Sequence, residues 1–160
     1  MTMVTHPVAE LGKYVVADPS ACPGRLKFRG TRIPVDDVLK QVAAGKDWDS
    51  ISRGTHGKIR HEAIAEALQL ATTTLLEANP KNRGTETRDL GEYVIAHPLI
   101  CHGALTVRGT RVFVEGVLYF VAKNMAWDQI TREWHGSVST EAIAEAVELA
   151  RLALVRQELG

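Results

Sequence analysis

Cysteine is scarce in this sequence, with only Cys22 and Cys101 among 160 residues. Two cysteines without a signal-peptide pattern favour reduced thiols over a disulfide framework. Long apolar runs are also absent, because none approaches the roughly 18 residues that a membrane-spanning helix requires. We therefore expect a soluble, cytoplasmic protein without a membrane partner, in which both cysteines are small buried thiols.

An excess of either charge is missing as well. The 19 Lys and Arg residues equal the 19 Asp and Glu residues, so the formal net charge is zero. Residues 1–79 carry +1, residues 80–89 carry +1 and residues 90–160 carry −2. A neutral chain argues against a broadly basic, nucleic-acid-binding surface, so any basic surface must be local.

Signatures of catalysis are missing too. No phosphate-binding loop or dinucleotide fingerprint occurs in the sequence. His56 and His135 each precede a glycine, but no serine or cysteine nucleophile with a third orienting residue accompanies them. We expect these two histidines to cap helix C-termini, where a cationic ring is favoured.

A metal site has equally little support. The candidate ligands are Cys22, His97, Cys101 and His102. Their spacing follows no repeated zinc pattern. The sequence therefore predicts no enzyme, no cofactor and no metal site.

What the sequence does contain is an internal duplication. Shifted by 79 positions, residues 11–72 align with residues 90–151 without a gap, and 32 of the 62 pairs are identical. The most distinctive shared stretch is Arg29-Gly30-Thr31-Arg32-Ile33-Pro34-Val35, which returns as Arg108-Gly109-Thr110-Arg111-Val112-Phe113-Val114. Units of about 60 residues bury little surface alone, so we expect the two copies to share a core.

Each copy is predicted to open with a β-hairpin. Residues 14–17 and 25–29 have strand character around a Pro- and Gly-containing turn, and residues 93–96 and 104–108 repeat the pattern. The alternation of apolar residues changes phase across Gly30 and Gly109. A phase change at glycine indicates a β-bulge or a sharp bend.

Three helices are predicted to follow each hairpin. The first carries an apolar stripe over residues 35–43 or 114–122, and ends at Gly45 or Asn124, residues that accept a left-handed conformation. The second spans about residues 48–56 or 127–135. The third follows Gly57 or Gly136, and Ser139 is its expected N-cap in the second copy. Its predicted apolar stripe in the first copy is Ile59, Ala63, Ile64, Ala67, Leu70 and Ala71.

The sequence therefore predicts an α+β fold that is mainly α. Two tandem repeats, each a short N-terminal β-hairpin followed by a trihelical, helix-turn-helix-like unit, occupy residues 11–78 and 90–159. Residues 79–89 form an exposed linker. We expect the repeats to pack as an intrachain pseudo-dimer, so the chain is either a monomer with an internal pseudo-two-fold axis or part of a higher homo-oligomer.

The second and third helices, joined by a predicted turn of three or four residues, match the helix-turn-helix pattern, whose last helix enters the DNA major groove. The predicted contacts to bases or phosphates are Lys58, Arg60 and His61 in the first copy, Ser137, Ser139 and Thr140 in the second, and Arg53 and Arg132 for backbone phosphates. The alternative is also open, because many trihelical units never touch DNA and exposed basic residues often lie on a solvated helix face.

Two arginine pairs are kept in both copies: Arg29 with Arg32, and Arg108 with Arg111. They either clamp phosphates at the base of the hairpin or serve the fold, by pairing with acidic side chains at the start of the first helix or with helix C-terminal carbonyls. We favour the structural role, because positions shared by both copies usually serve the shared fold. Gly30, Thr31, Gly109 and Thr110 are expected to shape the backbone.

These motifs resemble a known family. The residues that carry the resemblance are Pro19 to Gly24, the stretch from Arg29 to Val35, Gly45, Ile51 and Ala67-Leu68. They are similar to the domain-of-unknown-function family 433, and the resemblance covers almost all of residues 11–72 and again 90–151. The chain therefore looks like a tandem pair of such domains.

The resemblance implies an antitoxin-like role, since such domains are commonly encoded beside PIN-like ribonuclease toxins. A protein of this kind silences its toxin through one surface and binds operator DNA, a double-stranded partner, through another. The second copy departs from the family pattern, because Phe113 replaces the proline and Gly116 stands where the first copy has Asp37. This drift favours a structural or partner-binding role for the second copy, and a protein-interaction module without DNA binding is the alternative function.

Overall fold

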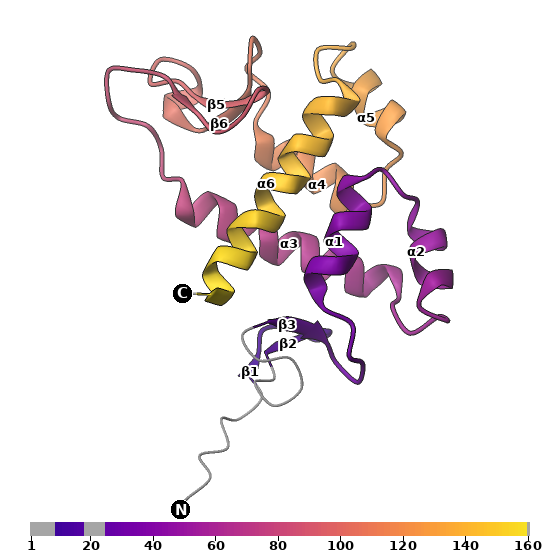
Figure 1. Cartoon of the computed structure of the whole chain (residues 1–160). Helices are drawn as coiled ribbons and strands as arrows, with labels where there is room; N and C mark the ends of the chain where they lie inside the picture. The colour runs from indigo at the N-terminus through magenta and orange to yellow at the C-terminus, as the bar shows by residue number, and fades with distance from the viewer. Residues whose placement is uncertain (1–8, 18–24, 160) are drawn as a thin grey trace, which may run out of the picture.

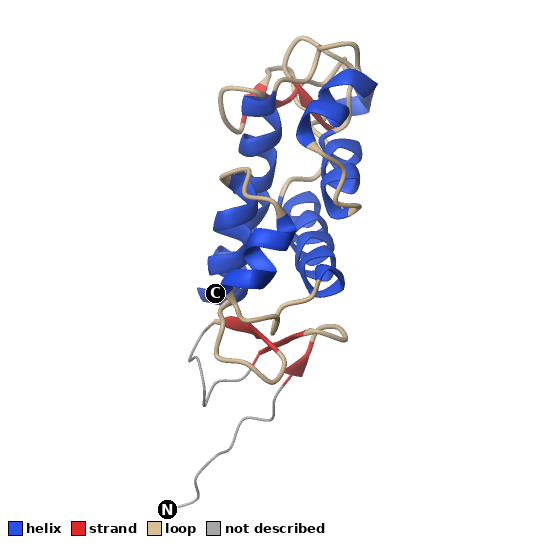
Figure 2. Ribbon diagram, turned by 90° about the vertical axis from the view of Figure 1, so that its right-hand side faces the viewer, coloured by secondary structure: helices blue, strands red, loops and turns tan. Residues whose placement is uncertain are grey.

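A computed structural model describes residues 9–17 and 25–159 of the chain. The helices form the body of the molecule, and two small sheets lie at its opposite ends (Figure 2). The turn predicted around Pro19 to Gly24, including Cys22, lies outside the described residues. The second Cys residue, Cys101, was expected to be buried but is partly exposed, with its Sγ 3.4 Å from the carbonyl oxygen of Arg111.

Each repeat begins with the expected antiparallel hairpin, widened by a short edge strand. The strands are β1 (Ala9–Glu10), β2 (Val15–Ala17) and β3 (Leu26–Phe28) in the first sheet and β4 (Arg88–Asp89), β5 (Val94–Ala96) and β6 (Leu105–Val107) in the second. The edge strands were not predicted, because two residues are too few to show an alternating pattern. Strand β4 falls within the range predicted as linker.

The linker is fastened to the second sheet through Asn82. Its backbone N–H donates to the carbonyl of Gly103 at 2.8 Å, and its side-chain amide donates to the carbonyl of Ala96 at 2.7 Å. A Cβ atom at Gly103 would overlap the backbone of Asn82. The second repeat is therefore held against the linker by hydrogen bonds as well as by chain connection.

Glycine at the Gly-Thr-Arg stretch makes a tight turn and not a bulge. The φ angle is 73° at Gly30 and 78° at Gly109, in the left-handed region that favours glycine. The N–H of Thr31 donates to the carbonyl of Phe28 at 3.1 Å, and the N–H of Phe28 donates to the carbonyl of Ile33 at 3.1 Å. The chain therefore reverses at Gly30, which explains the change of apolar phase.

The three-helix pattern of each repeat is confirmed. The helices are α1 (Val35–Ala43), α2 (Trp48–Gly54) and α3 (His61–Ala78) in the first repeat and α4 (Val114–Ala122), α5 (Trp127–Glu133) and α6 (Thr140–Leu159) in the second. Gly45 and Asn124 end α1 and α4 with φ angles of 82° and 59°, as the sequence predicted. His56 and His135 also adopt positive φ, at 55° and 53°, directly after α2 and α5.

The connection between the second and third helices is longer than predicted. Residues 55–60 and 134–139 join the helices, whereas the sequence indicated three or four residues. Helix α2 ends in a left-handed cap, in which the N–H of Gly57 donates to the carbonyl of Ser52 at 2.9 Å. The chain must then extend to bury Ile59 before α3 can begin, and Val138 is buried in the same way before α6.

The two repeats interlock. Helices α3 and α6 pack on each other, and α1 contacts α6 more extensively than it contacts α3 of its own repeat (Figure 1). Likewise, α4 contacts α3 more extensively than it contacts α6. The predicted intrachain pseudo-dimer is therefore present, and each first helix completes the core of the other repeat.

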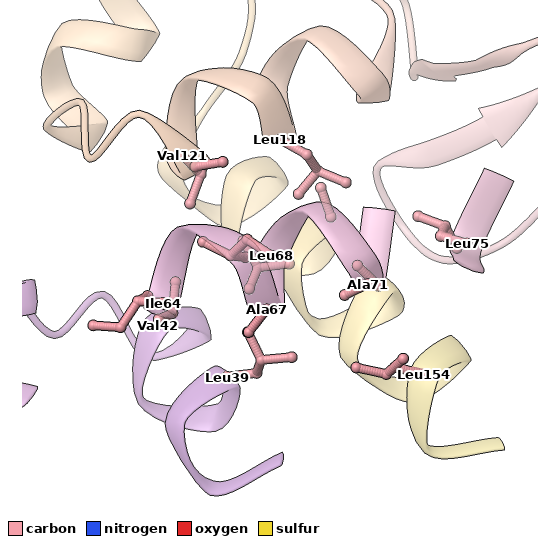
Figure 3. Packing of buried hydrophobic residues seen from close by; sticks show 14 of the residues in the cluster. Leu39, Val42, Ile64, Ala67, Leu68, Ala71, Leu75, Leu118, Val121 and Leu154 are labelled. Atoms are coloured by element: carbon pink, nitrogen blue, oxygen red, sulfur yellow. The ribbon is translucent and has the colours of Figure 1, made fainter. Parts of the chain in front are cut away.

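This arrangement buries two faces of α3. Figure 3 shows Leu68 on the side of α3 that faces Leu118 and Val121 of α4, while Leu39 of α1 lies on the other side. Leu68 is fully buried, although it lies outside the apolar stripe that the sequence predicted for this helix. A single apolar stripe predicts one buried face, whereas α3 packs against α1 and against α4.

A buried ion pair joins the repeats on one side only. Arg151 of α6 donates to Asp36 of α1, with Nη1 2.5 Å from Oδ1, and also contacts Glu148. Asp36 is 8% exposed and lies 3.5 Å from the ammonium group of Lys40. On the other side of the pseudo-two-fold axis the equivalent positions, 79 residues away, hold Glu115 and Thr72, which cannot form this pair.

The ion pair predicts an acid-sensitive contribution to stability. Burial by itself raises the pKa of Asp36, but the hydrogen bond and charge of Arg151, with help from Lys40, outweigh it and leave that pKa below its usual value. A lowered pKa stabilises the fold above about pH 4, and the contribution is lost as the pH falls through the pKa of the folded state.

We expect Asp36→Asn to cost about 2 kcal/mol at pH 7 and less at pH 3. Urea unfolding followed by circular dichroism at both pH values measures the difference. Asp37→Asn is the matched control, because its carboxylate is exposed and lies 3.8 Å from Arg25. An equal cost of Asp36→Asn at both pH values would show that the charge of Asp36 is not the stabilising element.

Candidate functional site: the Gly-Thr-Arg loops and the helix connections

The first arginine of each shared stretch, Arg29 or Arg108, binds the loop between the edge strand and the hairpin. Arg29 donates from Nε to the carbonyl of Lys13 at 2.9 Å, and Arg108 donates to the carbonyl of Glu92 at 2.8 Å. Arg108 also pairs with Asp89 at 3.1 Å. The structural role is therefore present, although these bonds go to loop carbonyls and not to the helix ends that the sequence suggested.

The threonine of the stretch closes the same turn. The hydroxyl of Thr31 donates to the carbonyl of Phe28 at 2.8 Å and accepts the N–H of Ile33 at 3.1 Å. Thr110 repeats both bonds, at 2.7 and 3.0 Å. The Gly-Thr pair thus shapes the backbone, as expected, and leaves the second arginine of each stretch, Arg32 or Arg111, exposed.

Sequence reasoning missed a carboxylate clamp that fixes each hairpin to the third helix. Glu66 of α3 accepts backbone N–H groups from Lys13, Tyr14 and Val15 at 2.6, 2.6 and 2.9 Å. Glu145 of α6 accepts the equivalent three at 3.1, 2.8 and 3.0 Å. A Cβ atom at the adjacent glycine, Gly12 or Gly91, would overlap the carboxylate. The sequence signal for this clamp is that its glutamate and glycine are identical in both copies, although neither lies in an apolar stripe.

Three of the predicted DNA contacts form an exposed cationic connection in the first repeat. Arg53 lies in the last turn of α2, Lys58 lies in the connection and Arg60 precedes α3, and all three are exposed. No acidic residue occurs between positions 50 and 61. The fourth predicted contact, His61, points to α2, where its Nε2 is 2.9 Å from Asp49 and its ring packs edge-on against Trp48.

The second repeat places its predicted contacts differently. Arg132 pairs with Asp128 at 3.3 Å, and the hydroxyl of Ser139 accepts the N–H of Ala142 at 3.1 Å, which confirms Ser139 as an N-cap. Thr140 is exposed beside Glu141, 3.3 Å away. The second connection therefore offers hydroxyls and one paired arginine where the first offers three cations.

The remaining residue, Ser137, lines an open groove of about 530 Å³ in the second repeat. This groove brings the Gly-Thr-Arg loop together with the α5–α6 connection, two segments that are separate in the sequence. Its lining residues are Gly109, Thr110, Arg111, Val112, Phe113, Gly116, Trp134, His135 and Ser137.

The third helices themselves are poorly suited to reading DNA bases. Helix α3 contains no lysine or arginine, and Glu62 is exposed in its first turn. Helix α6 exposes Glu141 at the same place. Negative side chains at the start of a helix repel phosphates, so nucleic acid would approach the connections more readily than the helix faces.

No group of three or more His, Cys, Asp or Glu side chains within residues 9–17 and 25–159 is arranged to hold a metal ion. None of the helices in these ranges combines the length and the apolar composition that a membrane crossing requires.

Comparison with known families gives two matches, at residues 15–71 and 94–150, to the family described as protein of unknown function, DUF433. This chain belongs to the DUF433 family. The matches confirm a tandem pair of DUF433 domains, each covering one hairpin and most of its three helices. Neither a curated protein nor a solved structure matches the chain.

The two DUF433 domains keep the clamp and the Gly-Thr-Arg turn but differ around the groove. Going from the first domain to the second, the replacements are Pro34 by Phe113, Asp37 by Gly116, Thr55 by Trp134, Lys58 by Ser137 and Arg60 by Ser139. Charged and small side chains give way to aromatic and neutral ones. The shared scaffold therefore presents a basic surface in one domain and an aromatic surface in the other.

Proposed function

We propose that this chain is an antitoxin-like regulator that binds operator DNA and neutralises a PIN-like ribonuclease toxin. The observation that carries the DNA-binding part is the exposed cationic connection of the first repeat, formed by Arg53, Lys58 and Arg60. Side chains of this kind bind backbone phosphates. The proposal assigns no catalytic role to the chain.

The arrangement of the pseudo-dimer supports a contact with a duplex. Helices α2 and α5, which precede the two connections, lie on the same side of the molecule, at the right in Figure 1. Arg53 and Arg132 occupy equivalent positions on these helices. In this complex the cations of the first connection bind DNA phosphates and the second connection adds hydroxyl contacts. The complex is therefore asymmetric, and most contacts go to the sugar-phosphate backbone of the DNA.

Replacing Lys58 and Arg60 by alanine is expected to weaken binding to the chain's own promoter DNA and to flatten its salt dependence. Each lost phosphate contact lowers the slope of log K against log salt by about 1. Fluorescence anisotropy with labelled promoter duplex at several salt concentrations measures both quantities.

The matched control is Lys81→Ala with Arg83→Ala, which removes two exposed cations from the linker and leaves the connection intact. This control should bind like the unaltered protein. An unaltered protein that gives no salt-sensitive binding to its promoter would rule out the DNA-binding part, and equal losses in both double variants would assign the effect to net charge alone.

The second candidate is a protein-interaction module with a structural or scaffolding role and no DNA binding. The observation in its favour is the aromatic, neutral surface of the second repeat, where Ser137 and Ser139 replace the two cations of the first. Co-expression with the product of the adjacent gene tests the partner-binding part of both candidates. A chain that purifies alone in that experiment would argue against a neighbouring toxin as the partner.

A further inference from the structure

We infer that the groove of the second repeat is a docking site for a protein segment that carries an apolar side chain next to a carboxylate. The groove has a volume of about 530 Å³ and is open to solvent on the surface of the chain. One wall is the Gly-Thr-Arg loop with Arg111, and the other is the α5–α6 connection with Trp134 and His135. The inference rests on the partner-binding part of the proposed function and names its surface.

The apolar half of the site is built from two aromatic rings. Phe113, the residue before α4, is 48% exposed, although phenylalanine is among the residues most often buried. Trp134 is half-buried, and its ring lies 5.4 Å from the ring of Phe120, which holds it in place. Exposed aromatic anchors with fixed positions are typical of the energetic centres of protein interfaces.

The charged half of the site is Arg111. Its side chain is exposed and forms no ion pair with any residue in the described parts of the chain. By contrast, Arg108 of the same loop is bound to backbone carbonyls and to Asp89. An arginine that the fold leaves unpaired beside two aromatic rings complements a carboxylate, which it can bind through two parallel hydrogen bonds.

Comparison of the two repeats favours a protein over a nucleic acid as the occupant. Ser137, which lines the groove, stands where the first repeat has Lys58, so the groove lacks that phosphate-binding cation. It has gained Phe113 and Trp134 in place of proline and threonine. Aromatic residues and arginine are enriched at protein interfaces, while lysine is depleted.

A substitution at Gly116 is expected to block the groove. The residue lies in the first turn of α4, and a Cβ atom there would have only Trp134 as a close neighbour, at 3.9 Å. Gly116→Asp restores the residue of the first repeat, Asp37, at a position where an acidic side chain suits a helix N-terminus. The variant therefore places a carboxylate beside Trp134, in the groove that Arg111 also lines, at a helix position that accepts an acidic residue.

The test uses a random library of linear twelve-residue peptides selected on the full chain, followed by affinity measurements with the enriched peptides by fluorescence anisotropy. We expect enriched sequences to combine an apolar side chain with a nearby Asp or Glu. Their affinity should fall about tenfold or more for Gly116→Asp and for Phe113→Pro. Leu99→Ala, at an apolar residue that is 87% exposed outside the groove, is the matched control and should leave the affinity unchanged.

The outcomes separate this inference from the DNA-binding proposal. The Lys58→Ala, Arg60→Ala double variant lacks two cations of the first connection and should bind the enriched peptides like the unaltered chain, so loss of the DNA complex leaves the peptide result interpretable. Failure to enrich any peptide, or enriched peptides that bind Gly116→Asp and the unaltered chain equally well, would overturn the docking site. Binding of a single-stranded oligothymidylate that both groove variants abolish, without peptide binding, would instead assign the groove to nucleic acid.

Discussion

Cut in its linker between Arg83 and Gly84, the chain is expected to fold only when both fragments are present. Each fragment alone should lack a cooperative unfolding transition, because α1 depends on α6 and α4 depends on α3 for burial. A fragment of about 80 residues without its partner would also expose the face of α3 or α6 that the other repeat covers. Circular dichroism and size-exclusion chromatography of the separate and mixed fragments measure the effect.

The mixed complex should be preferred over pairs of the first fragment. In such a homodimer Asp36 would face Thr72, the equivalent of Arg151, and would lose its main buried partner. Asp36 would keep Arg25 at 3.2 Å and Lys40 at 3.5 Å, but loss of the hydrogen bond from Arg151 would cost about 2 kcal/mol. A first fragment that melts cooperatively as a monomer would contradict the dependence of each repeat on the other.

Replacing Glu66 by alanine is expected to destabilise the protein by about 3 kcal/mol, the second large effect. Its carboxylate accepts three backbone N–H groups from the loop before β2, and these donors would lose their shared partner. Glu66→Gln should recover part of the loss, since its amide keeps one acceptor oxygen but turns an NH₂ group toward the remaining donors. Urea unfolding followed at 222 nm gives the free energies.

Glu77→Ala is the control for this series, because Glu77 lies on the same helix and its side chain is exposed. Its free energy of unfolding should stay within about 0.5 kcal/mol of the unaltered protein. Glu145→Ala should reproduce the loss of Glu66→Ala, since Glu145 makes the same three bonds in the second repeat. A change at Glu66 no larger than that at Glu77 would show that the clamp does not stabilise the hairpin.

Local features were predictable from the sequence because they depend on neighbouring residues. The 79-residue repeat, the hairpins and the three helices of each copy follow from apolar periodicity and turn residues. The left-handed helix ends at Gly45 and Asn124, and the N-cap at Ser139, follow from the conformational preferences of those residues. The family likewise follows from the Gly-Thr-Arg stretch that both copies share.

The candidate surfaces were only partly predictable. The exposure of Lys58 and Arg60 follows from their position outside any apolar stripe, but the pairing of His61 with Asp49 depends on how α2 and α3 meet. The groove escaped prediction because it unites Arg111 with Trp134, which are distant in sequence and come together only when α4 and α5 pack.

The duplicated sequence predicts the hairpins, the three helices of each copy and their left-handed ends, since each depends on contacts within a few residues. Only the tertiary structure decided that the repeats interlock, that Asp36 pairs with Arg151, and that Glu66 and Glu145 hold the hairpins. These features join residues 50 or more positions apart, and no periodicity records which distant partner a side chain meets. The two copies share one scaffold, yet the replacement of Thr55 by Trp134 and of Lys58 by Ser137 gives one a basic connection and the other an aromatic groove as its exposed surface.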